Sequence, residues 1–378
     1  MKLLYKILKA KKIFKKPEQK KFLILDSYNS VIFEKYIKKD EFGIFHTRYE
    51  SLNFFVLLKN IFKLKFNFFD YMIEYIKLSN CKFIVSFYDN NISFYKLKEY
   101  FPDKTVIIIQ NGTRSEFFFD RLSEKDLKAD YVLTFSDLYS EKFKQRVNTN
   151  SIAIGSFKNN LIIKKEFRTD KSIAYISDYA FPITSKNKSK NYINVGENRK
   201  VEMDKYYLPE RELLPILLSF CKKNQLKLKI IARAKYTSTL DLEKKFYETI
   251  LSPDSFELFD TFKFDNCYKF SDQSSLTVNI QSAFGLESIA RGNRTVIFNV
   301  RDKATNIRSL RLFPTDEHIV SKGPFWSDEV KKEEVYRTLN YSLNSSEEEW
   351  KKTISKIIPR IISFDLDNSK FKQIINEK

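Results

Sequence analysis

The segment from Ser275 to Asn299 constrains the fold of this chain more than any other. Its residues predict a strand, a tight Ser/Gly turn, a short helix that ends at Gly292, and a second strand, which together make one βαβ unit. The polar turn follows the first strand, and open α/β sheets bind their ligands at the carboxyl ends of strands. The segment therefore predicts a parallel sheet with a ligand site beside residues 281–287.

The residue types in this turn suit an anion. Gln281, Ser282 and Gly285 let backbone and hydroxyl donors approach a negative group at the helix N-terminus, where unpaired N–H groups and the helix dipole favour it. Glu287, further along the helix, is placed to accept hydrogen bonds from a ribose diol. An ordinary crossover with a capped helix and a surface Glu287 is the alternative interpretation.

The rest of the chain alternates predicted strands and helices. Each predicted strand of the first half runs into polar or Gly-containing residues at its carboxyl end; these strands are 22–26, 42–46, 83–87, 105–109, 131–135 and 151–154. The second half begins with predicted strands at 172–177, 228–232 and 256–259. This alternation is typical of doubly wound parallel sheets. We therefore predict an α/β protein with two Rossmann-like domains, residues 1–165 and residues 166–378.

The composition agrees with two domains. A chain of 378 residues with 43% hydrophobic residues can bury two cores. The formal charge of +19 indicates nucleic acid, an anionic membrane or an acidic substrate as partner, although the accompanying Ile, Asn and Phe are also typical of AT-rich coding. Cys81, Cys221 and Cys267 show no paired spacing, which favours a reducing compartment without disulfides or a zinc cluster.

Two segments combine apolar residues and lysines at helical spacing. Residues 1–16 predict a basic amphipathic helix of the kind that lies in an anionic membrane interface. Residues 54–69 are a second candidate, for which packing against the core is an equally good interpretation. No segment has the roughly 18–20 uninterrupted apolar residues that span a bilayer, and the N-terminus lacks a signal-peptide pattern. We expect a cytoplasmic protein, peripheral on the inner face of the membrane.

Several catalytic motifs are missing from the sequence. It has no Walker loop, no G-x-S-x-G, no H-E-x-x-H and no G-x-G-x-x-G after the first strand, which argues against P-loop enzymes, serine hydrolases, zincins and dinucleotide oxidoreductases. No Asp-x-Asp metal-binding pair follows a predicted strand of the sheets, because Asp365-Leu-Asp367 lies in the C-terminal tail. We therefore expect no metal and no cofactor. A basic nucleic-acid-binding protein is an alternative that the charge suggests, but the aromatic residues are mostly Phe in apolar runs, so we expect no nucleic acid partner.

Three patches resemble motifs of the GT-B glycosyltransferases, which have two Rossmann-like domains facing a central cleft. Gln110-Asn-Gly resembles their Q-H/N-G loop, and Gly155-Ser-Phe resembles the segment that ends their N-terminal domain. The run from Gln281 to Gly292 is similar to their S-S/T-x-x-G-x-E-A-x-A-x-G donor motif. Within this superfamily the chain is most similar to surface-polysaccharide and capsule transferases, including those that use CMP-activated Kdo-like sugars.

The resemblance implies roles for these residues. The backbone at Ser282, Ala283 and Gly285 would bind the donor phosphate, and Glu287 would hold the ribose. The resemblance also implies acceptor or cleft positions for Gln110, Asn111, Gly112, Arg114 and Ser156.

A basic pair completes the implied donor site. Arg233 and Lys235 match the position of a basic group or a His-Pro turn that contacts phosphate, and a guanidinium binds two oxygens in one plane. The chain reads Ala232-Arg-Ala-Lys there and lacks the His-Pro pair of several CMP-sugar transferases, which weakens the CMP assignment.

Glycosyl transfer needs a group that accepts a proton or attacks the anomeric carbon. Asp178 is the first candidate and Asp89 the second, because each follows a predicted strand; Asp26 is a third that suits a helix cap equally well. His46 ends a strand beside Arg48 and Glu50 and is the candidate base, although a lone histidine is more often structural.

The predicted function is therefore transfer of a sugar from a nucleotide-activated donor to a lipid-linked or surface-polysaccharide acceptor. A CDP-polyol phosphotransferase of the same fold is the nearest alternative. The N-terminal domain would bind the membrane and the acceptor, and the second domain would bind the donor.

Overall fold

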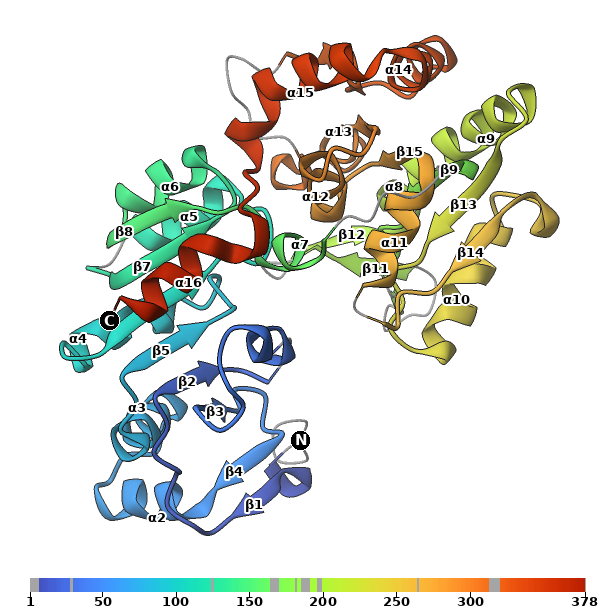
Figure 1. Ribbon diagram of the computed structural model, residues 1–378. Coiled ribbons are helices and arrows are strands. Elements are labelled where there is room, and N and C mark those ends of the chain that lie inside the picture. The colour runs from blue at the N-terminus through green and yellow to red at the C-terminus, as the bar shows by residue number, and fades with distance from the viewer. Residues whose placement is uncertain are drawn as a thin grey trace. The chain divides into compact units, whose positions relative to one another are not determined.

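The computed structural model describes residues 7–27, 30–123, 126–163, 170–180, 182–184, 191–195, 199–263, 265–312 and 320–377. The chain divides into two compact units (Figure 1). The N-terminal unit consists of Met1–Lys158 and Asn368–Lys378, and the C-terminal unit consists of Asn159–Asp367. In the described part of the chain, no helix is both long enough and apolar enough to cross a bilayer.

The N-terminal unit is built on a six-stranded parallel sheet with the order β3-β2-β5-β6-β7-β8. The strands are β2 (Phe22–Leu25), β3 (Phe42–Phe45), β5 (Phe83–Ser86), β6 (Thr105–Ile109), β7 (Lys128–Thr134) and β8 (Asn148–Ala153). Every residue of β2, β5 and β6 is buried, as in parallel sheets that are covered on both faces.

The helices of this unit follow the strands in the chain. They are η1 (Ser30–Lys35), α2 (Phe54–Phe62), α3 (Phe68–Ser79), η2 (Ile92–Lys96), α4 (Leu97–Tyr100), α5 (Glu116–Ser123), α6 (Asp137–Lys144) and α16 (Ser369–Asn376). Helix α7 (Phe157–Leu161) contains the point where the chain passes into the C-terminal unit.

The last helix belongs to the core of the N-terminal unit. Phe371 of α16 is fully buried, and its ring lies 5.0 Å from that of Phe157 and 6.0 Å from that of Phe33. Lys370 Nζ donates to the carbonyl of Ala153 at 2.7 Å. Residues 368–378 therefore differ from the sequence analysis, which assigned them to the second domain. The apolar spacing of a helix shows that one face is buried, and it does not show in which core.

The start of the chain also differs from expectation. Residues 7–9 are helical, but Lys11–Ile13 form strand β1, which pairs in parallel with β4 (Ser51–Asn53). The prediction of one continuous helix over residues 1–16 is therefore wrong, and residues 1–6 lie outside the described residues. The lysines at 11 and 12 lie on a strand edge rather than on a helix face.

The C-terminal unit has a seven-stranded sheet with the order β14-β13-β9-β15-β16-β18-β17. Its pairs are parallel except β17–β18; the strands are β9 (Asp170–Ile176), β13 (Lys227–Ile231), β14 (Glu257–Phe259), β15 (Ser274–Asn279), β16 (Thr295–Phe298), β17 (Lys322–Gly323) and β18 (Trp326–Ser327). A small antiparallel sheet contains β10 (Ile183–Thr184), β11 (Asn191–Asn194) and β12 (Lys200–Glu202).

Helices surround this sheet (Figure 1). They are α8 (Met203–Tyr206), α9 (Leu208–Lys223), α10 (Thr237–Glu248), η3 (Pro253–Ser255), α11 (Asn266–Gln273), α12 (Ala283–Ala290), α13 (Arg301–Thr305), η4 (Arg308–Leu310), α14 (Lys332–Asn344) and α15 (Glu347–Ile361). The short helix η5 (Leu366–Asn368) contains the point where the chain returns to the N-terminal unit. The predicted βαβ segment is confirmed as β15, α12 and β16.

Candidate functional site

The order in which the chain adds strands to the C-terminal sheet reverses between β9 and β15. From β9 the chain moves one way through β13 and β14, and it then returns to the other side of β9 with β15 and β16. Ligands of doubly wound folds bind outside the carboxyl ends of the strands at such a switch point. Asp178 follows β9 and the turn at 280–282 follows β15, so these two segments define the candidate site.

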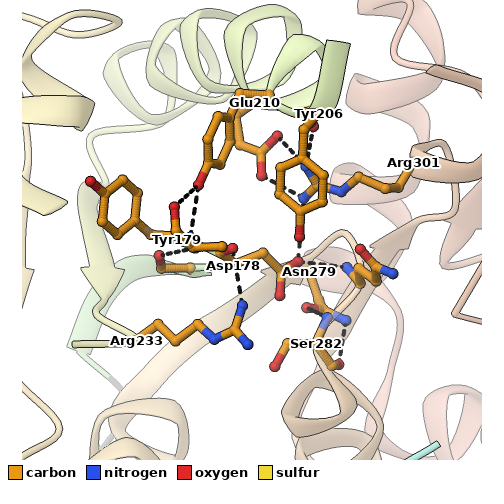
Figure 2. Close-up of polar contacts among 12 residues, drawn as sticks. Asp178, Tyr179, Tyr206, Glu210, Arg233, Asn279, Ser282 and Arg301 are labelled. Atoms are coloured by element: carbon orange, nitrogen blue, oxygen red, sulfur yellow. Dashed lines mark hydrogen bonds and ion pairs between the residues drawn. The ribbon is translucent and has the colours of Figure 1, made fainter. Parts of the chain in front are cut away.

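Asn279 shapes the turn after β15. Its side-chain Oδ1 accepts from the Ser282 N–H at 3.1 Å, and its Nδ2 donates to the Ser282 carbonyl at 2.9 Å. Ser282 then caps α12, because its hydroxyl accepts from the Phe284 N–H at 3.4 Å. The turn is therefore closed by a buried amide that the sequence analysis did not single out (Figure 2).

Gly285 is required by this amide. A Cβ at position 285 would lie 2.7 Å from the Cβ of Asn279 and closer still to its amide atoms. From the sequence, Gly285 was predicted to let a ligand approach, whereas in the structure the side on which a Cβ would lie is filled by Asn279. Glycine is needed here because a neighbouring side chain occupies the space.

Gly285→Ala is therefore expected to displace Asn279 and lower the free energy of unfolding by about 1–3 kcal/mol, the usual cost of overpacking. Urea unfolding followed by tryptophan fluorescence measures this change in the C-terminal unit, because both tryptophans, Trp326 and Trp350, belong to it. Gly292→Ala in the same segment is the comparison for backbone strain. Gly292 has a φ of +82° but open space around its Cβ position, so a loss of stability there comes from the backbone conformation and not from overpacking. A Gly285→Ala variant as stable as the native protein would contradict this account.

Asp178 connects the two sides of the switch point. Its Oδ2 accepts from the backbone N–H of Gln281 at 2.9 Å and lies 3.6 Å from Nη2 of Arg301. Its backbone carbonyl accepts from Nη1 of Arg233 at 3.3 Å. The structure thus brings together Asp178, Arg233 and Gln281, which the sequence predicted in one site from separate segments. Figure 2 shows the contact between Asp178 and Arg233.

Arg301 and Glu210 form a buried ion pair next to Asp178. Both side chains are fully buried; Arg301 Nη1 and Nη2 donate to the two carboxylate oxygens of Glu210 at 3.0 and 2.6 Å. The Arg301 guanidinium also donates to the carbonyl of Tyr206 and lies 4.1 Å from the centre of its ring. Burial raises the pKa of Glu210 although Arg301 opposes the shift. Burial lowers the pKa of Arg301, but Glu210, Tyr206 and Asp178 together raise it by more, so the pKa of Arg301 lies above its usual value.

The pairing of Arg301 with Glu210 was not predicted from the sequence. The signal available was the position of Arg301 shortly after a predicted strand of the sheet, the same signal that selected Asp178. Glu210 gave no signal, because it lies in the first turn of α9, where acidic residues are common.

The turn after β13 is held by a second buried carboxylate. Glu243 accepts from the backbone N–H groups of Arg233 at 3.0 Å and Ala234 at 2.8 Å, and from the Ser177 hydroxyl. Burial raises the pKa of Glu243, and these donors oppose the shift. The side chains of Arg233 and Lys235 remain exposed, and Lys235 Nζ donates to the Thr261 hydroxyl at 2.9 Å. Glu243 therefore fixes the backbone from which both cations project.

Glu287 is already engaged within α12. Its side chain is buried, and its Oε2 accepts from the Tyr268 hydroxyl at 2.6 Å. Burial and the Glu287 charge raise the pKa of Tyr268 well above its usual value, so this hydroxyl keeps its proton and donates. The contact competes with the expected ribose role of Glu287, because one carboxylate oxygen has a protein partner.

Gln110, Asn111, Gly112 and Arg114, four of the predicted acceptor residues, form a hydrogen-bonded network with the catalytic candidate Asp89 in the N-terminal unit. Asp89 is fully buried, and its carboxylate accepts from Arg114 Nε at 2.6 Å, from Arg114 Nη2, and from the Asn111 N–H at 3.2 Å. Gln110 is also buried; its amide accepts from the Phe135 N–H and donates to the Gly112 carbonyl, both at 2.8 Å. Ser156 is buried after β8. These groups hold the ends of β5, β6 and β7 together.

His46 lies in a different polar cluster at the carboxyl ends of β2 and β3. Its Nδ1 is buried, has no hydrogen-bond partner among the described residues and lies 3.8 Å from Oε2 of Glu50. Burial lowers the pKa of His46, while the charges of Glu50 and Asp26 raise it in opposition. Arg48 Nε donates to Asp26 Oδ2 at 3.0 Å, and the Arg48 guanidinium donates to the Tyr88 hydroxyl after β5.

This cluster lies at the switch point of the N-terminal sheet, between β2 and β5. Asp26, directly after β2, is buried and has a φ of 90°, a conformation that non-glycine residues seldom adopt and that concentrates at functional sites. Both units therefore place polar side chains at their switch points. Across the described residues, no group of three or more His, Cys, Asp or Glu side chains is arranged to hold a metal ion.

Two parallel doubly wound sheets with polar switch points define the GT-B class of fold. Solved structures agree: the wall teichoic acid polymerase TagF matches with a TM-score of 0.50 at 13% identity, over 95% of this chain and 88% of that one. The UDP-GlcNAc 2-epimerase of Methanocaldococcus jannaschii, in complex with UDP-GlcNAc and UDP, matches with a TM-score of 0.52 at 9% identity, over 94% and 99%.

The family follows from the sequence itself. Residues 107–378 match the model of a family described as "putative O-antigen biosynthesis protein", and the chain belongs to this family. No curated protein matches the chain.

Proposed function

We propose that this protein is a metal-independent glycosyltransferase of surface-polysaccharide assembly, which moves a sugar from a nucleotide-activated donor to a lipid-linked or polysaccharide acceptor. One observation carries the proposal: the start of α12 and the cations Arg233 and Lys235 flank the switch point between β9 and β15. Helix N-termini and cations are the groups that bind a donor's phosphates without a metal. Membership of an O-antigen biosynthesis family supports the same role.

The donor phosphate would bind at the first turn of α12. The N–H of Gln281 is taken by Asp178 and that of Phe284 by Ser282, whereas the N–H of Ala283 has no acceptor among the described residues. Arg233 is exposed, and among the described residues its guanidinium makes one hydrogen bond, from Nη1 to the Asp178 carbonyl; it would add a charge-assisted contact. In this proposal Asp178 orients Gln281 and Arg233 rather than attacking the donor.

His46 would be the general base, because its imidazole has a nitrogen without a hydrogen-bond partner among the described residues and a carboxylate, Glu50, nearby. The acceptor hydroxyl would lose its proton to His46 as its oxygen bonds to the anomeric carbon. The bond from that carbon to the phosphate oxygen would break, and the nucleotide would leave with the electron pair. Asp89 suits this role less well, because its carboxylate already accepts from Arg114 and Asn111.

A polyol-phosphate transferase is the second candidate function. The fold similarity to a wall teichoic acid polymerase favours it, and the same cations would bind a CDP-linked donor. In both cases the donor would carry a cytidine nucleotide, and a Kdo-like ulosonic acid activated by CMP is the donor we propose first.

Nucleotide binding should appear as a thermal shift that is followed by tryptophan fluorescence. A ligand at 100 times its Kd stabilises the folded state by about 2.7 kcal/mol, so the bound nucleotide should raise the melting temperature of the C-terminal unit. We expect a shift with CMP and a smaller one with UDP or GDP; a shift with CDP alone would select the polyol-phosphate transferase.

The test variant is Arg233→Ala, and its matched control is Arg211→Ala. Arg233 lies at the switch point, whereas Arg211 is an exposed residue of α9 that pairs with Asp204 at 2.9 Å. Arg233→Ala should reduce the nucleotide shift, and Arg211→Ala should leave it unchanged. If none of CMP, CDP, UDP and GDP shifts the native protein, the donor site is not at this switch point.

A further inference from the structure

Helix α2 and the residues after it expose more apolar surface than expected for a helix of a globular core. The helix buries Val56 and Asn60, whereas Phe55, Leu58 and Phe62, spaced i, i+3 and i+7, are exposed. Phe62 is 86% exposed, and Leu64 and Phe66, which follow the helix, are 80% and 75% exposed; among the described residues no other large apolar side chain is as exposed as these three. Contiguous exposed apolar surface of this kind marks an interaction site.

The N-terminal segment extends this surface. The ring of Phe14 lies 5.3 Å from that of Phe54, and strand β1 pairs with β4, which directly precedes α2. Phe14 and Leu8 are both exposed. We call residues 8–16 and 55–66 together the apolar–lysine surface.

The charge of the apolar–lysine surface is entirely positive. Its two segments contain no Asp or Glu and eight lysines: Lys9, Lys11, Lys12, Lys15, Lys16, Lys59, Lys63 and Lys65. Neighbouring acids compensate the three lysines near α2, because Glu74 pairs with Lys59 and Lys63, and Asp70 pairs with Lys65. Lys15 and Lys16 are exposed and have no ion-pair partner among the described residues.

We propose that the apolar–lysine surface docks the protein onto an anionic lipid bilayer. Phe62, Leu64 and Phe66 would enter the boundary between headgroups and acyl chains, while Lys15 and Lys16 would contact anionic headgroups, the arrangement of interfacial segments. A second copy of the chain fits less well, because two such surfaces face to face would bring lysines against lysines. The inference rests on exposure and charge, and it holds whether or not the protein transfers a sugar.

Vesicle cosedimentation of the full chain tests the proposal. The apolar variant is Phe62→Ser/Leu64→Ser/Phe66→Ser. The control variant, Ile163→Ser/Val320→Ser/Leu366→Ser, removes three other exposed apolar side chains, which lie outside the apolar–lysine surface. With phosphatidylcholine vesicles containing phosphatidylglycerol, we expect the apolar variant to lower the partition coefficient at least tenfold and the control variant less than twofold. Lys15→Glu/Lys16→Glu should weaken binding to these vesicles and leave the weaker binding to phosphatidylcholine alone unchanged.

The possible results separate the interpretations. Native-like vesicle binding by the apolar variant would overturn the proposal. Failure of the native chain to bind vesicles, together with concentration-dependent self-association that the apolar variant abolishes, would instead assign the surface to a second copy. The nucleotide thermal shift, which reports on the C-terminal unit, should be the same in the apolar variant as in the native chain. Loss of vesicle binding and loss of donor binding are therefore distinguishable.

Discussion

Arg301→Met is expected to lower the free energy of unfolding of the C-terminal unit by about 3–5 kcal/mol, because it leaves a buried carboxylate without its cation. Glu210 is fully buried and takes both of its charged hydrogen bonds from Arg301. Burial raises the pKa of Glu210, and the charge of Arg301 opposes this shift. Without Arg301, the pKa of Glu210 in the folded state therefore rises further above its value in the unfolded state. The loss of stability should therefore be largest at neutral pH and diminish as the pH falls and Glu210 takes up a proton.

Urea unfolding followed by tryptophan fluorescence measures this change, since Trp326 and Trp350 both lie in the C-terminal unit. Arg211→Met is the matched control. Arg211 directly follows Glu210 in α9, and its ion pair with Asp204 is exposed. Exposed ion pairs contribute about 0–1 kcal/mol to stability. Arg301→Met/Glu210→Gln should recover part of the stability, because the charge left behind is removed. A loss below about 1 kcal/mol for Arg301→Met would show that the ion pair is not important for folding.

His46→Gln is expected to lower kcat of sugar transfer by about 10²–10⁴-fold, the usual contribution of a general base. Glutamine keeps the size and polarity of the side chain but cannot take the acceptor proton. Because His46 lies in the N-terminal unit, the nucleotide thermal shift of the C-terminal unit should not change. The measurement is release of nucleotide from the donor that the thermal shift identifies, with His318→Gln, the same substitution at the second histidine, as control.

The pH dependence of kcat distinguishes a base from a structural histidine. Burial lowers the pKa of His46 from 6.5, so the neutral form that accepts a proton persists below that pH and activity should fall only in more acidic solution. The charge of Glu50 raises this pKa, so Glu50→Gln should move the acidic limb to still lower pH. A kcat of His46→Gln within threefold of the native value, or an acidic limb that Glu50→Gln leaves in place, would remove His46 from the mechanism.

Much of the fold was predictable from the sequence. Four of the six predicted strands of the first half form within one or two residues of their expected bounds, whereas β7 and β8 each begin three residues early, at Lys128 and Asn148. Local signals suffice here, because apolar runs of four to six residues followed by polar turns identify buried parallel strands. The helix predicted over residues 1–16 fails for a non-local reason, since the partner of β1 is β4, about forty residues later in the chain.

The candidate site was predictable only as a set of positions. Strand ends placed Asp178, Arg233 and Gln281 together correctly, because carboxyl ends of parallel strands share one edge of the sheet. The state of each side chain was not predictable. Asp89 and Asp178 both follow strands and both accept from a backbone N–H, but Asp89 also accepts directly from Arg114, whereas Arg301 lies 3.6 Å from Asp178 and donates to Glu210.

The sequence by itself determined the alternation of strands and helices, the turn after β15 and the family, because these depend on residue types within short segments. Only the tertiary structure decided which polar groups are engaged and which apolar faces remain exposed. The Arg301–Glu210 pair joins residues 91 positions apart, and the Gln281–Asp178 hydrogen bond joins residues 103 apart. Helical spacing gave α2 an apolar stripe, but the stripe faces outward, because burial depends on what the rest of the fold places against a helix.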